Sequence, residues 1–145
     1  MTSYETIYEK FLQKITDYKI LELEDKDVMM MLNGWMTSAI AKFRTCSSDL
    51  SNRDDVLMQF NDQLTDLEIE ILSILMVSEW LAPQVNSINL TKQMITGKDQ
   101  KFYSQSAHLK ELMDLKTASD KEARLLLNRY RLVNNNYLVN LIKLF

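Results

Sequence analysis

Glycine and proline are nearly absent from this chain, which has two glycines and one proline among its 145 residues. Few positions therefore favour the backbone dihedrals of tight turns, and the Asn-Gly and Asp-Gly pairs typical of β-hairpins do not occur. Apolar residues instead recur every three or four positions, which is the period of an amphipathic helix. We therefore predict an all-α protein, a small helical bundle of about four to five helices with an extended C-terminal segment.

Two amphipathic helices are predicted in the first third of the sequence. The first opens with Thr2 and Glu5, which stand at capping-box spacing, and its apolar stripe runs from Tyr4 to Ile15. An acidic run over residues 22–27 is suited to the start of the second, where the helix dipole favours negative charge. The second helix has an apolar stripe for more than four turns, and Gly34 lies within this helix. Because glycine in a helix costs about 1 kcal/mol relative to alanine, this glycine predicts the close approach of another backbone.

Four of the nine methionines lie on this second predicted helix. Met31 and Met36 are expected to fill the core. Met29 and Met30 remain candidates for an adaptable surface that faces a partner, because methionine is common at such surfaces.

The middle of the chain combines a loop with a strongly apolar helix. Residues 45–55 are rich in Ser, Asn and Asp and predict a surface loop, and residues 54–63 fit either a short helical turn or an extended piece. Thr65 and Glu68 repeat the capping-box spacing. Residues 69–82 are apolar on nearly every side, which is typical of a buried helix. Pro83 then predicts a kink or an end near Leu81.

A further helix is expected to begin around residues 104–106. Ser119 and Glu122 form a third pair at capping-box spacing. Residues 117–120 are therefore either a solvated stretch of one long helix or a short break between two helices.

The last residues of the sequence are unusually apolar. Three consecutive asparagines, Asn134 to Asn136, are followed by nine residues of which six are aliphatic or phenylalanine. We therefore predict a helical bundle domain over residues 1–133 and a docking segment over residues 134–145, the C-terminal arm. Its predicted partner-binding residues are Tyr137, Leu138, Val139, Leu141, Ile142, Leu144 and Phe145.

Groups that perform chemistry are scarce. His108 and Cys46 are the only residues of their types, and neither stands at a spacing that would pair it with a base, a nucleophile or a metal. The carboxylates follow no ion-loop pattern, and those near Glu68 are interpreted as the acidic start of a helix. With two glycines, no phosphate-binding glycine motif can be written. We predict that the protein is not an enzyme and uses no cofactor and no metal.

Charge and hydropathy restrict the class of partner. There are 17 Lys and Arg against 20 Asp and Glu, a net charge of −3 with both signs interspersed. Nucleic-acid binders need a concentrated basic face, which this distribution does not supply. The longest apolar stretch falls short of the roughly 20 residues that a bilayer requires, so we expect a soluble protein without membrane contact.

The order of these features resembles the head–tail adaptor, or connector, proteins of the neck of tailed bacteriophages. The resemblance covers residues 4–130 and is carried by a set of scattered positions: Phe60, Leu64, Thr65, Glu68, Ile71, Leu72, Met76, Val77, Trp80, Leu81, Lys98, Asp99, Phe102, Tyr103, Ser104, His108 and Leu109. It implies a homo-oligomeric ring, dodecameric in such proteins, that contacts the portal protein and a tail-side neck or tail completion protein. It also implies that DNA passes through without sequence-specific binding.

These implications lead to a prediction of function and place. We expect a structural protein of the virion neck, made in the cytoplasm of the host bacterium, that forms part of the DNA channel. The alternative is a small helical DNA-binding or regulatory phage protein. Its recognition helix would lie within residues 121–131, which carry Arg124, Arg129 and Arg131.

Overall fold

The computed structural model describes residues 1–15, 25–94 and 100–134. These residues form four helices and a three-stranded sheet of two-residue strands, so the predicted all-α bundle is confirmed. The helices are α1 (Tyr4–Lys14), α2 (Asp25–Lys42), α3 (Asp66–Met94) and α4 (Gln100–Asn134). The strands are β1 (Thr2–Ser3), β2 (Arg53–Asp54) and β3 (Gln59–Phe60).

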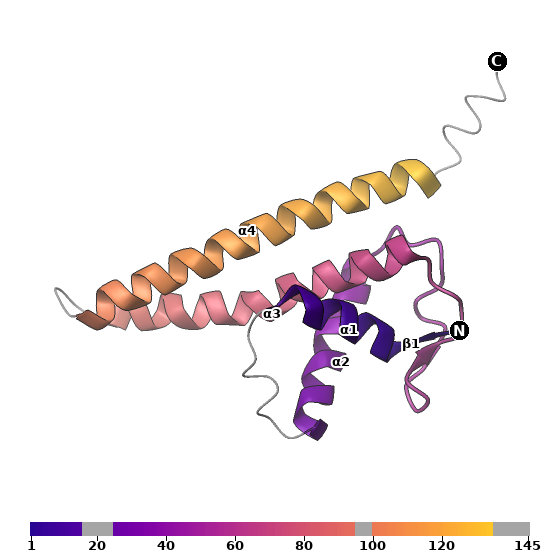
Figure 1. Ribbon diagram of the computed structural model, residues 1–145, viewed down its shortest axis with the longest axis horizontal. Coiled ribbons are helices and arrows are strands. Elements are labelled where there is room, and N and C mark those ends of the chain that lie inside the picture. Colours follow the sequence, from indigo (N-terminus) through magenta and orange to yellow (C-terminus); the bar gives the residue numbers. More distant parts are fainter. Residues whose placement is uncertain (16–24, 95–99, 135–145) are drawn as a thin grey trace, which may run out of the picture.

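Helix α3 is the centre of the molecule. It contacts α1, α2 and α4, and α4 lies alongside it over most of its length (Figure 1). Every residue from Ile71 to Ser78 is buried, which confirms the prediction of a buried central helix. The helix nevertheless continues through Pro83 to Met94, so of the two predicted alternatives, a kink or an end near Leu81, the end is wrong. Gln84 Nε2 donates to the carbonyl of Trp80 at 3.1 Å in the turn that contains the proline.

The start of α1 is held by the small sheet and not by the predicted capping box. Ser3 is the N-cap, and its hydroxyl accepts from the backbone N–H of Glu5 at 3.2 Å. Thr2 belongs to β1, which pairs antiparallel with β3, and its hydroxyl accepts from the N–H of Leu64 at 2.9 Å. Thr2 cannot cap α1 because its hydroxyl is bound to the segment between β3 and α3, at Leu64.

Residues 53–60 form a β-hairpin. Of the two structures predicted for this segment, a short helical turn or an extended piece, the extended one is therefore confirmed. Its strands pair antiparallel in the sheet order β1-β3-β2. The chain reverses without glycine, because Met58 adopts a φ of 53°. The carboxylate of Asp54 supports the turn by accepting from the N–H groups of Val56 and Leu57.

The second helix differs from expectation at two positions. A Cβ placed on Gly34 would meet nothing within 4 Å, so the predicted close approach of a backbone is wrong. Met31 is exposed, contrary to its predicted place in the core, whereas Met36 is buried as predicted. Leu32, Met36 and Ala39 form the buried face of α2, three or four residues apart, and Phe43, directly after the helix, is buried as well.

Residues 117–120 lie inside one long helix, α4, which begins at Gln100 and not near residue 104. Ser119 is buried and caps nothing. Its neighbour Asp120 accepts from Ser78 of α3 at 2.6 Å and from Lys116 at 2.8 Å. Burial opposes ionisation of Asp120, but these donors outweigh it and lower the pKa of the carboxyl. The polar stretch therefore fastens α4 to α3.

Candidate functional site

The described residues bring one polar cluster into the core, centred on the buried carboxylate of Glu68 in the first turn of α3. The capping box predicted for this helix is confirmed in both directions. Glu68 Oε1 accepts from the N–H of Thr65 at 2.8 Å, and the hydroxyl of Thr65 accepts from the N–H of Glu68 at 3.2 Å.

Glu68 also connects three parts of the chain that are distant in sequence. Its Oε2 accepts from the Tyr130 hydroxyl of α4 at 2.7 Å and from the Cys46 thiol at 3.1 Å. Its Oε1 accepts from the Ser48 hydroxyl at 3.1 Å. The Tyr130 oxygen accepts in turn from the N–H of Ser47 at 2.7 Å. The loop after α2, the start of α3 and the end of α4 therefore meet at one carboxylate.

The donors keep this carboxylate ionised inside the core. Burial opposes the charge of Glu68, but the hydrogen bonds from the Thr65 N–H, Tyr130, Cys46 and Ser48 outweigh it, so the pKa of the carboxyl lies below its usual value. Burial raises the pKa of Tyr130 to about 12, and the bond to Glu68 acts in the same direction. The tyrosine therefore remains a protonated donor at neutral pH.

The Cys46 thiol of this cluster is held in its protonated form. Burial, followed by the bond to Glu68, raises the pKa of the Cys46 thiol to about 12, so almost no thiolate nucleophile exists at neutral pH. His108 is exposed on α4. In the three described ranges, no group of three or more His, Cys, Asp or Glu side chains could hold a metal ion. Within the same ranges, no helix is long and apolar enough to cross a membrane.

Large apolar side chains are exposed at two places. On α4, Leu125 and Leu132 are 60% and 61% exposed, and their spacing of seven residues puts them on one face. Around the hairpin, Val56 and Leu57 are exposed in the turn, while Met29 and Met30 of α2 line a hollow beside Met58. The predicted surface methionines are thus exposed.

The predicted partner-binding residues of the C-terminal arm, from Tyr137 to Phe145, lie outside the described residues. Sequence reasoning missed the cluster around Glu68. The capping box predicted one of its bonds, but the bonds to Tyr130 and Cys46 join residues 62 and 22 positions apart, which no local pattern reveals.

Comparison with known proteins does not connect this chain to a family or to a solved fold. Neither a family model, nor a curated protein, nor a solved structure matches the chain.

Proposed function

We propose that this chain is a structural protein of the neck of a tailed bacteriophage, a head–tail adaptor that acts by binding other protein surfaces. Its subunits form a ring, dodecameric according to the resemblance described above. The ring joins the portal protein to a tail-side neck or tail completion protein, and DNA passes through it without sequence-specific binding. The chain is then located in the virion neck and has no enzymatic role.

The observation that carries the proposal is the apolar surface of α4. Leu125 and Leu132 are exposed to solvent on the face of α4 that points away from α3. The exposed cations Lys121 and Arg129 lie beside them. An apolar centre with a charged rim is typical of surfaces that bind proteins. The buried cluster supports the same interpretation, because it ties Tyr130 and the end of α4 to the body and so presents a rigid surface.

The alternative of a regulatory DNA-binding protein is less well supported. Residues 121–131 belong to the C-terminal third of a 35-residue helix packed alongside α3, whereas a helix-turn-helix presents a short second helix at a steep angle to the first. Two of the cations of this segment, Lys121 and Arg129, lie one helical turn from the exposed Leu125 and therefore share its face. Such a face suits a protein surface better than a phosphate backbone.

Localisation and mutation test the proposal together. Mass spectrometry and negative-stain imaging of purified phage particles should find the chain in the neck. Leu125→Asp combined with Leu132→Asp should leave the circular dichroism of the subunit unchanged and abolish ring formation. Val56→Asp, a charge placed on an exposed aliphatic side chain elsewhere, is the matched control and should still assemble. A chain absent from particles, with DNA binding that weakens as salt rises, would establish the regulatory alternative instead.

A further inference from the structure

Two exposed apolar surfaces lie on opposite sides of the molecule. The first, the α4 patch, consists of Leu125 and Leu132. The second, the methionine hollow, lies between Met29 and Met30 of α2 and Met58 of the hairpin. In Figure 1, α4 runs along the top of the molecule, whereas the start of α2 and the hairpin lie at its lower side, with α3 in between. One chain therefore cannot bring its own α4 patch to its own hollow.

The methionine hollow has the size of a pocket for the side chains of another protein. Its volume is about 280 Å³, whereas pockets for small molecules usually span roughly 300–1,000 Å³. Met29 and Met30 line it from α2, and Met58 lines it from the hairpin, with Tyr4 and Asn33 as further lining residues. Methionine side chains are flexible and polarisable, so such a hollow can adapt to an apolar side chain that enters it.

The rim of the hollow carries an excess of acidic groups. Asp55 Oδ1 accepts from the Tyr4 hydroxyl at 2.6 Å and lies 3.7 Å from Arg53 Nε, yet the side chain of Asp55 is 74% exposed. Its second oxygen can therefore accept from another molecule. Lys26 is the cation among the lining residues, and the exposed carboxylate of Asp27 follows it on α2. The exposed groups of the rim are thus two carboxylates and one ammonium.

The α4 patch has cations beside its leucines. Lys121 precedes Leu125 by one helical turn and lies on the same face. It is exposed, and no described residue forms an ion pair with it. Arg129 is also exposed and stands at the edge of the patch, where it lines a hollow toward α1. The leucines suit a methionine-lined hollow and the cations suit its acidic rim, so the two surfaces are complementary in both respects.

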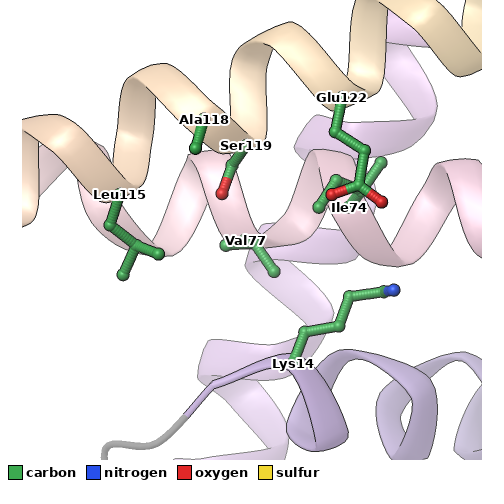
Figure 2. A pocket seen from close by; sticks show the side chains of 7 residues that line it. All are labelled: Lys14, Ile74, Val77, Leu115, Ala118, Ser119 and Glu122. Atoms are coloured by element: carbon green, nitrogen blue, oxygen red, sulfur yellow. The ribbon is translucent and has the colours of Figure 1, made fainter.

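The flank of α4 that faces α1 is a less suitable surface for an apolar partner. Figure 2 shows that the hollow on this flank, of about 250 Å³, is lined by charged groups of both signs, Lys14 of α1 and Glu122 of α4. Lys14 also forms an ion pair with Glu70. The neighbouring hollow is lined by Lys10, Asp66 and Glu70 among others. The outer face, which contains the α4 patch, is therefore the part of α4 that best suits an apolar partner.

A second copy of the chain is the occupant that satisfies both surfaces with one kind of contact. In a head-to-tail arrangement every subunit offers its α4 patch to one neighbour and its hollow to the other. Such a heterologous contact generates a ring when the rotation between neighbours closes. A pair of α4 patches bound to each other would instead leave both hollows open.

We propose that the α4 patch of one subunit binds in the methionine hollow of the next subunit. This inference deepens the proposed function and rests on it for the closed ring, because it names the surface that each α4 patch meets. Val56 is 91% exposed in the turn of the hairpin and is not among the residues that line the hollow. Its replacement by aspartate therefore remains a valid control for assembly.

Sedimentation velocity of two blocked full-length chains, alone and mixed, tests the proposal. Leu125→Asp combined with Leu132→Asp removes the α4 patch and keeps the hollow, whereas Met30→Asp spoils the hollow and keeps the patch. All three side chains are exposed, so the circular dichroism of each variant should match that of the unmodified chain. The unmodified chain should form larger oligomers as its concentration rises, and each blocked chain alone should remain a monomer. Their equimolar mixture should form a one-to-one complex and nothing larger, because one intact surface of each kind is left.

Single substitutions measure the contributions of charge and of position. Lys121→Asp, added to the Met30→Asp chain, should raise the dissociation constant of the mixed complex about tenfold or more, because it places an acid against the acidic rim. Lys110→Asp, the same change about 16.5 Å away along α4, is the matched control and should leave that constant unchanged. Met113→Asp is the control for Met30→Asp, since Met113 is also exposed but lies outside both surfaces. This chain should form oligomers as the unmodified chain does.

The mixture also separates this contact from its rivals. Blocked chains that stay monomeric when mixed would overturn the proposal. Dimers of the Met30→Asp chain alone would overturn it as well, because they would show that α4 patches bind each other. The outcome is distinct from that for the proposed function. A chain found in the virion neck whose blocked variants do not associate would lose this inference and keep the function, whereas a one-to-one complex of a chain absent from particles would keep the contact and lose the function.

Discussion

Replacing Tyr130 with phenylalanine measures how strongly the buried cluster fastens α4 to the body. The change removes a hydroxyl that donates to Glu68 at 2.7 Å and accepts from the N–H of Ser47 at 2.7 Å. A hydrogen bond to a charged partner contributes about 1.5–3 kcal/mol and a neutral one about 0.5–1.5 kcal/mol. Because Ser47 is exposed and water can replace its partner, we expect a total loss of about 2–4 kcal/mol in the free energy of unfolding.

The assay is urea denaturation followed by circular dichroism at pH 7. The midpoint should fall while the slope with denaturant stays the same, since a lost hydroxyl does not alter the surface exposed on unfolding. The gap between wild type and variant should narrow as Glu68 becomes protonated at low pH, because the charged acceptor is then lost.

Tyr8 supplies the matched control for this substitution. Its ring is buried like that of Tyr130, but its hydroxyl has no hydrogen-bond partner among the described residues. Because an unpaired buried hydroxyl is unfavourable, Tyr8→Phe should be neutral or slightly stabilising. If Tyr130→Phe shifts the free energy by less than about 0.5 kcal/mol, or no more than Tyr8→Phe does, the reasoning about the cluster is refuted.

Three further predictions concern the folded body. Gly34→Ala should stabilise the protein by about 1 kcal/mol in chemical denaturation, because the added methyl meets nothing within 4 Å and alanine is the better helix former; a destabilised variant would mean that this face of α2 is covered. Leu72→Ala and Trp80→Ala should each cost about 2–5 kcal/mol, because both side chains are buried on α3; shifts within about 0.5 kcal/mol would contradict this burial. Stability should also fall at both ends of a pH titration. Glu68 stabilises the fold above its unfolded pKa of about 4.3, and this contribution is lost as pH falls through its lower folded pKa. Tyr130 favours the fold below its unfolded pKa of about 10, and this contribution is lost as pH rises toward about 12; a flat alkaline limb in the titration would contradict it.

Sequence reasoning succeeded where a local period or pair decides the structure. The stripe of α2, the buried run of α3 and the Thr65–Glu68 box each depend on residues within a few positions of one another. It failed where tertiary contacts override local preference. Helix α3, which packs along α4, continues through Pro83. The pairing of β1 with β3 moves Thr2 away from the position where it would cap α1. Met58 adopts the left-handed conformation in the hairpin turn, where the sequence has no glycine that would have predicted it.

The candidate site was predictable only in part, for a related reason. The exposure of Met29 and Met30 was predicted from the sequence, whereas the exposed Leu125 and Leu132 of α4 were not. The hollows lined by Lys10 and Lys14 of α1 together with residues of α4 depend on how far apart two helices rest on a third, which periodicity does not specify.

The continuation of α3 through Pro83 has a consequence for hydrogen exchange. Proline has no N–H to offer the carbonyl of Glu79, so the ladder of the helix is interrupted there. In Figure 1 the far ends of α3 and α4 extend beyond α1 and α2, so that part of the helical pair lacks their support. Local opening of residues 84–94 therefore needs less free energy than global unfolding. Their amides should exchange well before those of residues 69–81. Helix α3 would then show weak protection from hydrogen exchange after Pro83 and strong protection before it.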